Sequence, residues 1–464
     1  MKTNRVIKIF LASSEELEAD RYRFGNLIRK LDNIYEKRGI RIELFEWEDY
    51  DAAYNGMRKQ DEYNERVRAS DMFLALFHKK AGKFTIEEFN IARKAFDEQA
   101  SPKIYTYIKD LEAGESESRE LAEFKRLMLE ELGHYWCRYS NFDTMQLHFV
   151  LQLQMVEATT PIKVEVKESQ VKIGDSTIAD LNNVPFTSEN ATHRELQSRK
   201  EQLDREIGNA ESGGRRGFFG QRSRMTDEEL ANLMEERESV TEQIERQEKA
   251  LVDTAMSIAR MQGGECSPRM RTAAELFEKG EIDKAEAVFK EDDMEADATN
   301  AKLKFDTAAQ PTAELTRNIE QCAGEYMLKA RIVVSGIADE SRYRQAVKLM
   351  STAIDLVSGR LPEETLAEYL FDYAVLLTDT GQQTKALETW ERLSGIYERL
   401  YRKAPQKYAY GYAGVLNNMA VLYSDKGDFD HCLSKYLKAV DIYDWLDREE
   451  PSIYDDDIAR LKNN

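Results

Sequence analysis

The sequence predicts an α/β domain with a parallel sheet, followed by an all-helical region. Over residues 1–160, short apolar runs alternate with amphipathic stretches, as in parallel sheets that helices cover on both faces. From residue 188 onward the apolar residues recur at helical spacing. The predicted segments are an α/β domain at 1–160, a linker at 161–187, a helical hairpin at 188–262 and helical repeats at 268–464.

The predicted strands are short runs rich in Ile, Phe, Leu and Tyr, at residues 6–12, 40–45, 72–77 and 103–107. Helices are predicted at residues 15–38, 58–69, 86–98 and 117–131. Parallel sheets of this kind bind ligands at the carboxyl ends of their strands. Candidate site residues are therefore expected directly after each strand.

The apolar pattern differs between the linker and the segment that follows it. Residues 161–187 alternate in β fashion around Gly174-Asp175, which predicts a β-hairpin. Residues 188–262 then form two charged arms, and the second opens with a capping box at Thr226. Its apolar stripe, interrupted at Arg237, Gln247 and Thr254, predicts an antiparallel coiled-coil hairpin.

The segment GGRRGFFGQRSR (213–224) joins the two arms and holds four arginines, two phenylalanines and no acid. We expect a solvated loop here. The alternatives are contact with nucleic acid, a membrane or another subunit.

Segments after residue 270 share an internal pattern. A glycine is followed five residues later by a small residue and four further on by a large apolar one. The three copies are Gly280, Ala285 and Phe289; Gly381, Ala386 and Trp390; Gly427, Cys432 and Tyr436. Ala346 and Met350 fit the same slots without the glycine.

This pattern resembles the tetratricopeptide (TPR) repeat, in which glycine permits the tight turn between two helices and the small residue lets them approach. The stretch VLNNMAVLYSDKGDFDHCLSKYLKAVDIY is similar to the repeats of kinesin light chains. The resemblance implies a concave surface that binds a protein or a peptide.

Composition excludes several classes of function. The chain has 86 acidic and 66 basic residues, a formal charge of −20, which opposes binding to nucleic-acid backbones and anionic membranes. No apolar stretch approaches the roughly 20 residues that span a bilayer, so a cytoplasmic protein is expected. The five histidines lack metal-ligand spacing, and no metal site is expected. The scattered cysteines (Cys137, Cys266, Cys322 and Cys432) are interpreted as buried, reduced thiols.

The main candidate site lies in ASDMFLALFHKKAGKFTIEEFNIARKA (69–95). An acid leads into a buried strand, a short glycine-containing loop follows, and Glu87 and Glu88 come at the start of a helix. Adjacent side chains point about 100° apart on a helix, so only one carboxylate can face a pocket. The structural alternative is that both acids only favour the positive end of the helix dipole.

The segment resembles the Toll/interleukin-1 receptor (TIR) family, over about residues 5–150. Asp71 matches the strand-leading acid of that family, Phe84 its aromatic position and Glu88 its glutamate. The resemblance implies a flavodoxin-like fold and cleavage of NAD, with Glu88 catalytic and Phe84 stacked on nicotinamide. NAD is then a substrate, and no cofactor is expected. A carboxylate suits this reaction because it stabilises or captures an oxocarbenium-like charge.

The same resemblance implies further substrate contacts. In the first-strand motif of the family, Ala12 stands at the usual serine position, and Ser13 and Ser14 are its candidate substitutes. The loop after the second strand can contact adenine or ribose, although Trp47 can equally pack. The candidate substrate-binding residues are Phe10, Ser13, Ser14, Trp47, Asp49, Tyr50 and Phe84.

The segments IKIFLASS, SDMFLALF and GKFTIEEFNIA are also similar to nucleoside 2-deoxyribosyltransferases, which use a glutamate nucleophile at the same place. The coiled coil and the repeats favour the TIR hypothesis. In it, a protein or peptide trigger binds the repeats, the TIR and coiled-coil regions form a homo-oligomer, and NAD is cleaved to nicotinamide and ADP-ribose or cyclic ADP-ribose during bacterial anti-phage defence. The alternative from another class is a non-enzymatic TIR scaffold, in which Glu88 is dispensable.

Overall fold

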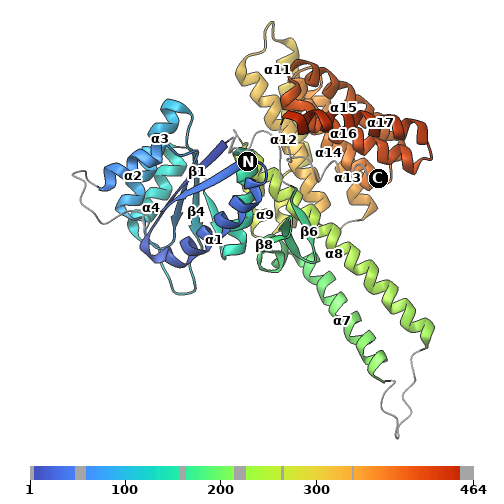
Figure 1. Ribbon diagram of the computed structural model, residues 1–464, viewed down its shortest axis with the longest axis horizontal. Coiled ribbons are helices and arrows are strands. Elements are labelled where there is room, and N and C mark those ends of the chain that lie inside the picture. Colours follow the sequence, from blue (N-terminus) through green and yellow to red (C-terminus); the bar gives the residue numbers. More distant parts are fainter. Residues whose placement is uncertain are drawn as a thin grey trace. The chain divides into compact units, whose positions relative to one another are not determined.

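The computed structural model describes residues 5–46, 59–132, 134, 136–156, 163–213, 226–262, 266–336 and 339–449 (Figure 1). The chain divides into two compact units. The sheet unit comprises Met1–Leu153, Lys163–Glu165 and Val171–Asn183, and the helical unit comprises Gln154–Ile162, Val166–Gln170 and Val184–Asn464. Within the described ranges, every helix is too short or too polar to cross a membrane.

The sheet unit contains five parallel strands in the order β2-β1-β3-β4-β5. Their bounds are β1 Arg5–Ser13, β2 Ile40–Phe45, β3 Met72–Phe77, β4 Lys103–Lys109 and β5 Cys137–Tyr139. The first four confirm the predicted strands and the α/β class. The edge strand β5 was not predicted, because its three residues form no apolar run.

Helices cover both faces of this sheet. They are α1 Glu18–Glu36, α2 Lys59–Arg68, α3 Lys83–Gln99, α4 Arg119–Arg126 and α5 Phe142–Val156. Apolar side chains of α2, α3 and α4 pack with β1 and β3 in one core cluster. On the other face α1 meets α5, where the rings of Phe24 and Phe149 lie edge to face with centroids 4.8 Å apart.

Several helix bounds differ from those predicted, and one helix was not predicted. Helix α3 begins at Lys83, three residues before the predicted start, because Gly82 in an extended conformation already serves as its N-cap. Helix α5 was not predicted because its sequence is apolar on most sides and lacks a clear helical period.

Asp71, the strand-leading acid, joins three strands. Its side chain accepts a hydrogen bond from the backbone N–H of Lys8 at 2.7 Å, and its own N–H donates to the carbonyl of Lys8 at 2.8 Å. The carbonyl of Asp71 accepts from the N–H of Lys103 at 2.9 Å. Asp71 thus sets the start of β3 between β1 and β4.

The linker forms a three-stranded sheet in the order β6-β7-β8, with bounds Glu165–Lys167, Gln170–Ile173 and Ser176–Asp180. The predicted hairpin corresponds to β7 and β8, and Gly174 in their turn has φ +55°. A second turn places Glu168 and Ser169 at φ 55° and 56°. It was not predicted because neither residue is a glycine, the usual occupant of this conformation.

The predicted helical hairpin consists of α7 (Ala191–Gly213) and α8 (Asp227–Gln262), shown in green to yellow-green in Figure 1. Glu229 and Thr226 form the predicted capping box at the start of α8. Leu203 of α7 packs against Val240 and Ile244 of α8. Ion pairs also connect the two helices, Arg199–Glu236 and Arg237–Asp204.

The apolar stripe of α8 changes partner along its length. The Gln247 side chain donates to the carbonyls of Ser335 and Gly336 at 3.5 and 3.3 Å, and the Thr254 hydroxyl lies 3.3 Å from the carbonyl of Arg331. These acceptors belong to or directly follow α12. The first half of α8 therefore pairs with α7 as a coiled coil. The second half of α8 packs against α12. Two of the three interruptions in the stripe are polar contacts to α12.

The remaining helices form a TPR-like array. They are α9 Pro268–Glu278, α10 Ile282–Ala287, α11 Glu291–Thr307, α12 Ala313–Ser335, α13 Glu340–Val357, α14 Glu363–Asp379, α15 Gln383–Lys403, α16 Pro405–Asp425 and α17 Phe429–Glu449. The predicted glycines at 280, 381 and 427 have φ of 78°, 68° and 75°. The small residues Ala285 and Ala386 are fully buried, and Trp390 is 1% exposed. The repeat pattern is confirmed.

Substituting alanine for two of these glycines tests how closely the repeat turns are packed. A Cβ at Gly280 would lie 2.5 Å from the carbonyl oxygen of Pro185 in α6 (Pro185–Ser188) and 2.8 Å from Cβ of Glu189, whereas a Cβ at Gly381 meets nothing within 4 Å. We expect Gly381→Ala to lower the free energy of unfolding by about 1–2 kcal/mol, because alanine is strained at a positive φ. Gly280→Ala should lower the free energy of unfolding by about 1–3 kcal/mol more, because its Cβ also clashes. Chemical denaturation followed by circular dichroism measures both. Equal losses would contradict the close approach at Gly280.

Candidate functional site

The orientation of α3 is set by its apolar residues. Phe89 is 1% exposed, and its ring lies 6.5 Å from that of Phe73 on β3 and 5.0 Å from that of Phe124 on α4. Ala92, three residues on, is fully buried. Because α3 directly follows β3, its first turns lie at the carboxyl edge of the sheet. The candidate residues of α3 are therefore held at the edge where such sheets bind ligands.

The two neighbouring carboxylates of α3 have different surroundings. Glu88 is buried, with 8% of its surface exposed. Glu87 is only partly buried and accepts a hydrogen bond from the side-chain amide of Asn64 on α2 at 3.3 Å. Glu87 therefore faces α2. A carboxylate in a site with little water interacts more strongly with a nearby positive charge than one in solvent, which favours Glu88 for the predicted chemistry.

Phe84 lies four residues before Glu88, on the same side of α3. Its side chain is 56% exposed, an unusual position for a large aromatic ring. An exposed ring one turn from a buried carboxylate offers a flat apolar surface for an aromatic ligand.

Ser13 and Ser14 lie at the carboxyl end of β1, where buried Arg21 contacts both. One Nη of Arg21 donates to the hydroxyl of Ser13 and to the carbonyl of Ser14, each at 2.9 Å. The Ser14 hydroxyl donates to Glu16 at 3.2 Å. Both serines thus hold the β1–α1 loop in place, and their predicted contact with substrate stays a prediction.

Phe10, another candidate, lies within the core. Phe10 is 2% exposed and stacks on Phe73 with centroids 5.9 Å apart, because alternate residues of β1 face the core under α3. Its observed role is packing, and its predicted contact with substrate stays a prediction. Trp47, Asp49 and Tyr50 lie outside the described residues.

The sequence prediction missed the contacts that hold the loop between β3 and α3. Glu16 accepts hydrogen bonds from the backbone N–H groups of Lys79 and Lys80 at 3.0 and 3.3 Å. Glu115 lies 2.5 Å from Nζ of Lys79 and 3.3 Å from Nε2 of His78. The Lys79 hydrogen bond lowers the pKa of Glu115, so this carboxylate stays ionised and keeps the loop fixed.

Asp20 is a second residue that the prediction missed. Its carboxylate, 4% exposed, accepts from Nζ of Lys109 at 2.9 Å and from the hydroxyl of Tyr139 at 3.0 Å. Burial, together with the charge of Asp20, raises the pKa of Tyr139, which therefore remains a hydrogen-bond donor. An acid in the first turn after β1 was the available sequence signal, but its partners lie 89 and 119 residues away.

His134 lies on the α3 side of the sheet. Its Nε2 is 3.0 Å from the hydroxyl of Thr106 on β4, and its ring centroid is 5.7 Å from that of Phe89. Burial lowers the pKa of His134 to about 4. The imidazole is therefore neutral at physiological pH.

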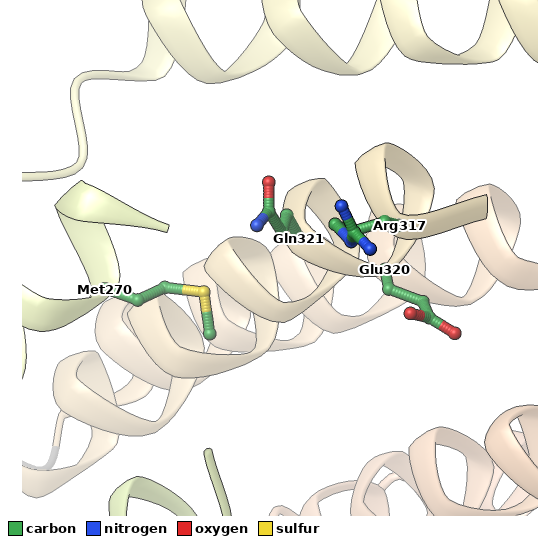
Figure 2. A pocket seen from close by; sticks show the side chains of 4 residues that line it. All are labelled: Met270, Arg317, Glu320 and Gln321. Atoms are coloured by element: carbon green, nitrogen blue, oxygen red, sulfur yellow. The ribbon is translucent and has the colours of Figure 1, made fainter. Parts of the chain in front are cut away.

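The helical unit has a small cavity of its own. It has a volume of about 210 Å³ and is lined by Met270 of α9 and by Arg317, Glu320 and Gln321 of α12 (Figure 2). The two helices approach closely here, since a Cβ at Gly324 would lie 3.1 Å from the terminal methyl of Met270. Pockets for drug-sized ligands are usually about 300–1,000 Å³, so this cavity is smaller than a typical ligand pocket.

Comparison with known proteins gives no assignment. No family model matches the chain, and no curated protein matches it. Among solved structures, a signal transduction ATPase with numerous domains (STAND) from Pyrococcus horikoshii, which has a tetratricopeptide repeat sensor, is 11% identical. The match covers 95% of this chain and 81% of that chain, with a TM-score of 0.23. A TM-score this low does not establish a common fold.

The pKa of His134 predicts a defined dependence of stability on pH. The unfolded chain binds a proton on this residue near pH 6.5 and the folded chain only near pH 4. Between these values the unfolded state binds more protons, so stability falls as pH falls from 6.5 to 4, and the contribution is fully present above 6.5. NMR titration of the histidine rings, assigned with His134→Gln, should give a midpoint near 4. A midpoint near 6.5 would contradict the buried position.

Proposed function

We propose that the sheet unit is a TIR-class NAD glycohydrolase with Glu88 as its catalytic residue. One observation carries the proposal: α3 holds a buried carboxylate one turn after an exposed aromatic ring, at the carboxyl edge of a parallel sheet. The order β2-β1-β3-β4-β5 is that of flavodoxin-like folds, in agreement with the TIR resemblance. Nicotinamide would stack on Phe84.

The chemistry requires one carboxylate. The bond between ribose C1 and the nicotinamide nitrogen breaks, and its electron pair leaves with nicotinamide as a neutral base. Glu88 stabilises the positive charge on the ribose or captures it covalently. Water then adds to C1 and loses a proton, which gives ADP-ribose. Attack by the adenine ring of the same molecule gives cyclic ADP-ribose instead.

The helical unit supplies control in this proposal. The TPR-like array binds a protein or peptide trigger, and the α7–α8 hairpin helps the TIR units form a homo-oligomer. TIR catalytic domains resemble one another in gaining activity on assembly. By the same resemblance the protein acts in the cytoplasm of a bacterium, where it depletes NAD during phage infection.

Glu88 and Glu87 form a matched pair for testing the catalytic assignment. We expect Glu88→Gln to reduce nicotinamide release at least about 100-fold, because the charge that stabilises the transition state is lost. Glu87→Gln should change it less than about threefold, because that carboxylate faces Asn64. Full-length protein at high concentration, NAD and separation of products by chromatography provide the measurement.

Other outcomes of this assay select among the alternatives. Activity that survives Glu88→Gln would overturn the assignment. Release of base from deoxynucleosides, but not from NAD, would favour a deoxyribosyltransferase-like enzyme. A wild type that stays inactive when fused to a clustering domain, yet self-associates, would favour the non-enzymatic scaffold.

Phe84 and Phe96 test the stacking surface in the same way. Both are exposed on α3, by 56% and 45%, but only Phe84 lies one turn from Glu88. Loss of a stacked ring costs about 1–1.5 kcal/mol, so Phe84→Ala should lower kcat/KM for NAD roughly tenfold. Phe96→Ala should leave it unchanged. Equal effects of the two substitutions would exclude stacking on Phe84.

A further inference from the structure

A second reactive group lies on the opposite face of the sheet. Cys137 begins β5 and pairs with Tyr107 of β4, and His148 lies on α5. The Sγ of Cys137 is 2.9 Å from Nε2 of His148, and the hydroxyl of Tyr107 is 3.0 Å from Nδ1 of the same ring. Three side chains thus form a continuous Cys–His–Tyr hydrogen-bonded chain, all within the sheet unit.

This arrangement is that of an activated nucleophile. A thiol lies within hydrogen-bond reach of a base, and a third group orients the base. When the proton of Cys137 moves to Nε2, both ring nitrogens of His148 donate hydrogen bonds, one to the thiolate and one to the hydroxyl oxygen of Tyr107. The thiolate is the reactive form of cysteine.

Two other groups near this pair are Gln152 and Tyr105. The amide nitrogen of Gln152 also approaches Nε2 of His148, but at 3.5 Å it lies farther away than the thiol. Burial raises the pKa of Tyr105, on the same strand as Tyr107, to about 12, so its phenol stays neutral. His148 is therefore the base that Cys137 contacts.

The other cysteines provide internal controls. Burial raises the pKa of Cys266, and it raises the pKa of Cys322 to about 11, so both remain thiols at neutral pH. Cys432 is 8% exposed against 9% for Cys137 and therefore matches it in burial. A difference in reactivity between these two cannot come from exposure alone.

We propose that Cys137 is a nucleophilic thiolate and the preferred oxidation site of this chain toward hydroperoxides. The thiolate attacks one oxygen of hydrogen peroxide, the S–O bond forms and the O–O bond breaks. The hydroxide that leaves takes the proton of the His148 imidazolium and becomes water. Sulfur is oxidised by two electrons to sulfenic acid, peroxide is reduced, and His148 returns to the neutral form.

This inference is independent of the proposed NAD chemistry. Glu88 belongs to α3, whose apolar residues pack on one face of the sheet, while Cys137 and His148 belong to the β4–β5–α5 contact of the other. NAD cleavage and thiol oxidation can therefore be measured separately.

Competitive labelling of the full-length protein tests the proposal. Limiting hydrogen peroxide is added with dimedone, which traps sulfenic acid, and peptide mass spectrometry compares the rates at the four cysteines. We expect Cys137 to be labelled at least about tenfold faster than Cys432. His148→Gln should reduce Cys137 to the rate of Cys432, and Tyr107→Phe should slow it several-fold by releasing the orientation of the ring.

Two results would overturn the proposal. One is equal labelling of Cys137 and Cys432 in the wild type. The other is fast labelling of Cys137 that persists in both variants, which would exclude activation by His148 as the cause. Circular dichroism checks the fold of each variant. If His148→Gln unfolds, Tyr107→Phe decides alone, because it removes a single hydroxyl and keeps the ring that packs against His148.

Discussion

The packing of Phe89 between Phe73 and Phe124 determines how the side chains of α3 are placed. A helix has one rotation about its axis that buries Phe89 and Ala92 against the sheet, and that rotation decides the direction of every other side chain on α3. It turns Glu87 toward Asn64, buries Glu88 and leaves Phe84 in solvent. The carboxylate and the ring of the proposed site are consequences of an aromatic contact in the core.

The alternation of side chains along β4 separates two kinds of chemistry. Neighbouring residues of a strand point to opposite faces, so Thr106 contacts His134 near Phe89, while Tyr107 contacts His148 on α5. The face of α3 carries a carboxylate suited to stabilising positive charge. The face of α5 carries a thiol next to a base. The proposed N-glycosidic site and the proposed oxidisable thiol thus lie on opposite faces of one sheet and share no residues.

In the helical unit, the close contact of a repeat glycine with neighbouring backbone constrains the packing. Gly280 lies so near Pro185 and Glu189 that a single added carbon would clash, which ties the first repeat to the start of the hairpin. Helix α8 then serves two partners, α7 along its first half and α12 along its second. Gln247 and Thr254 are polar because they meet backbone carbonyls of the second partner. Contacts of α8 therefore connect the hairpin with the array.

The sequence by itself determined the features that depend on neighbours along the chain: four of the strands, the glycine turns of the repeats, the capping box at Thr226 and the divergence of Glu87 and Glu88. These follow from period, turn chemistry and helix geometry, which are local. The strand order brought together what lies far apart, such as Asp20 with Lys109 and Tyr139, Glu16 with Lys79, and Cys137 with Tyr107. The short strand β5 and the second partner of α8 were also decided only by the tertiary structure. Contacts of this kind depend on which surfaces are still exposed after the helices and strands have formed. A local sequence pattern does not contain that information.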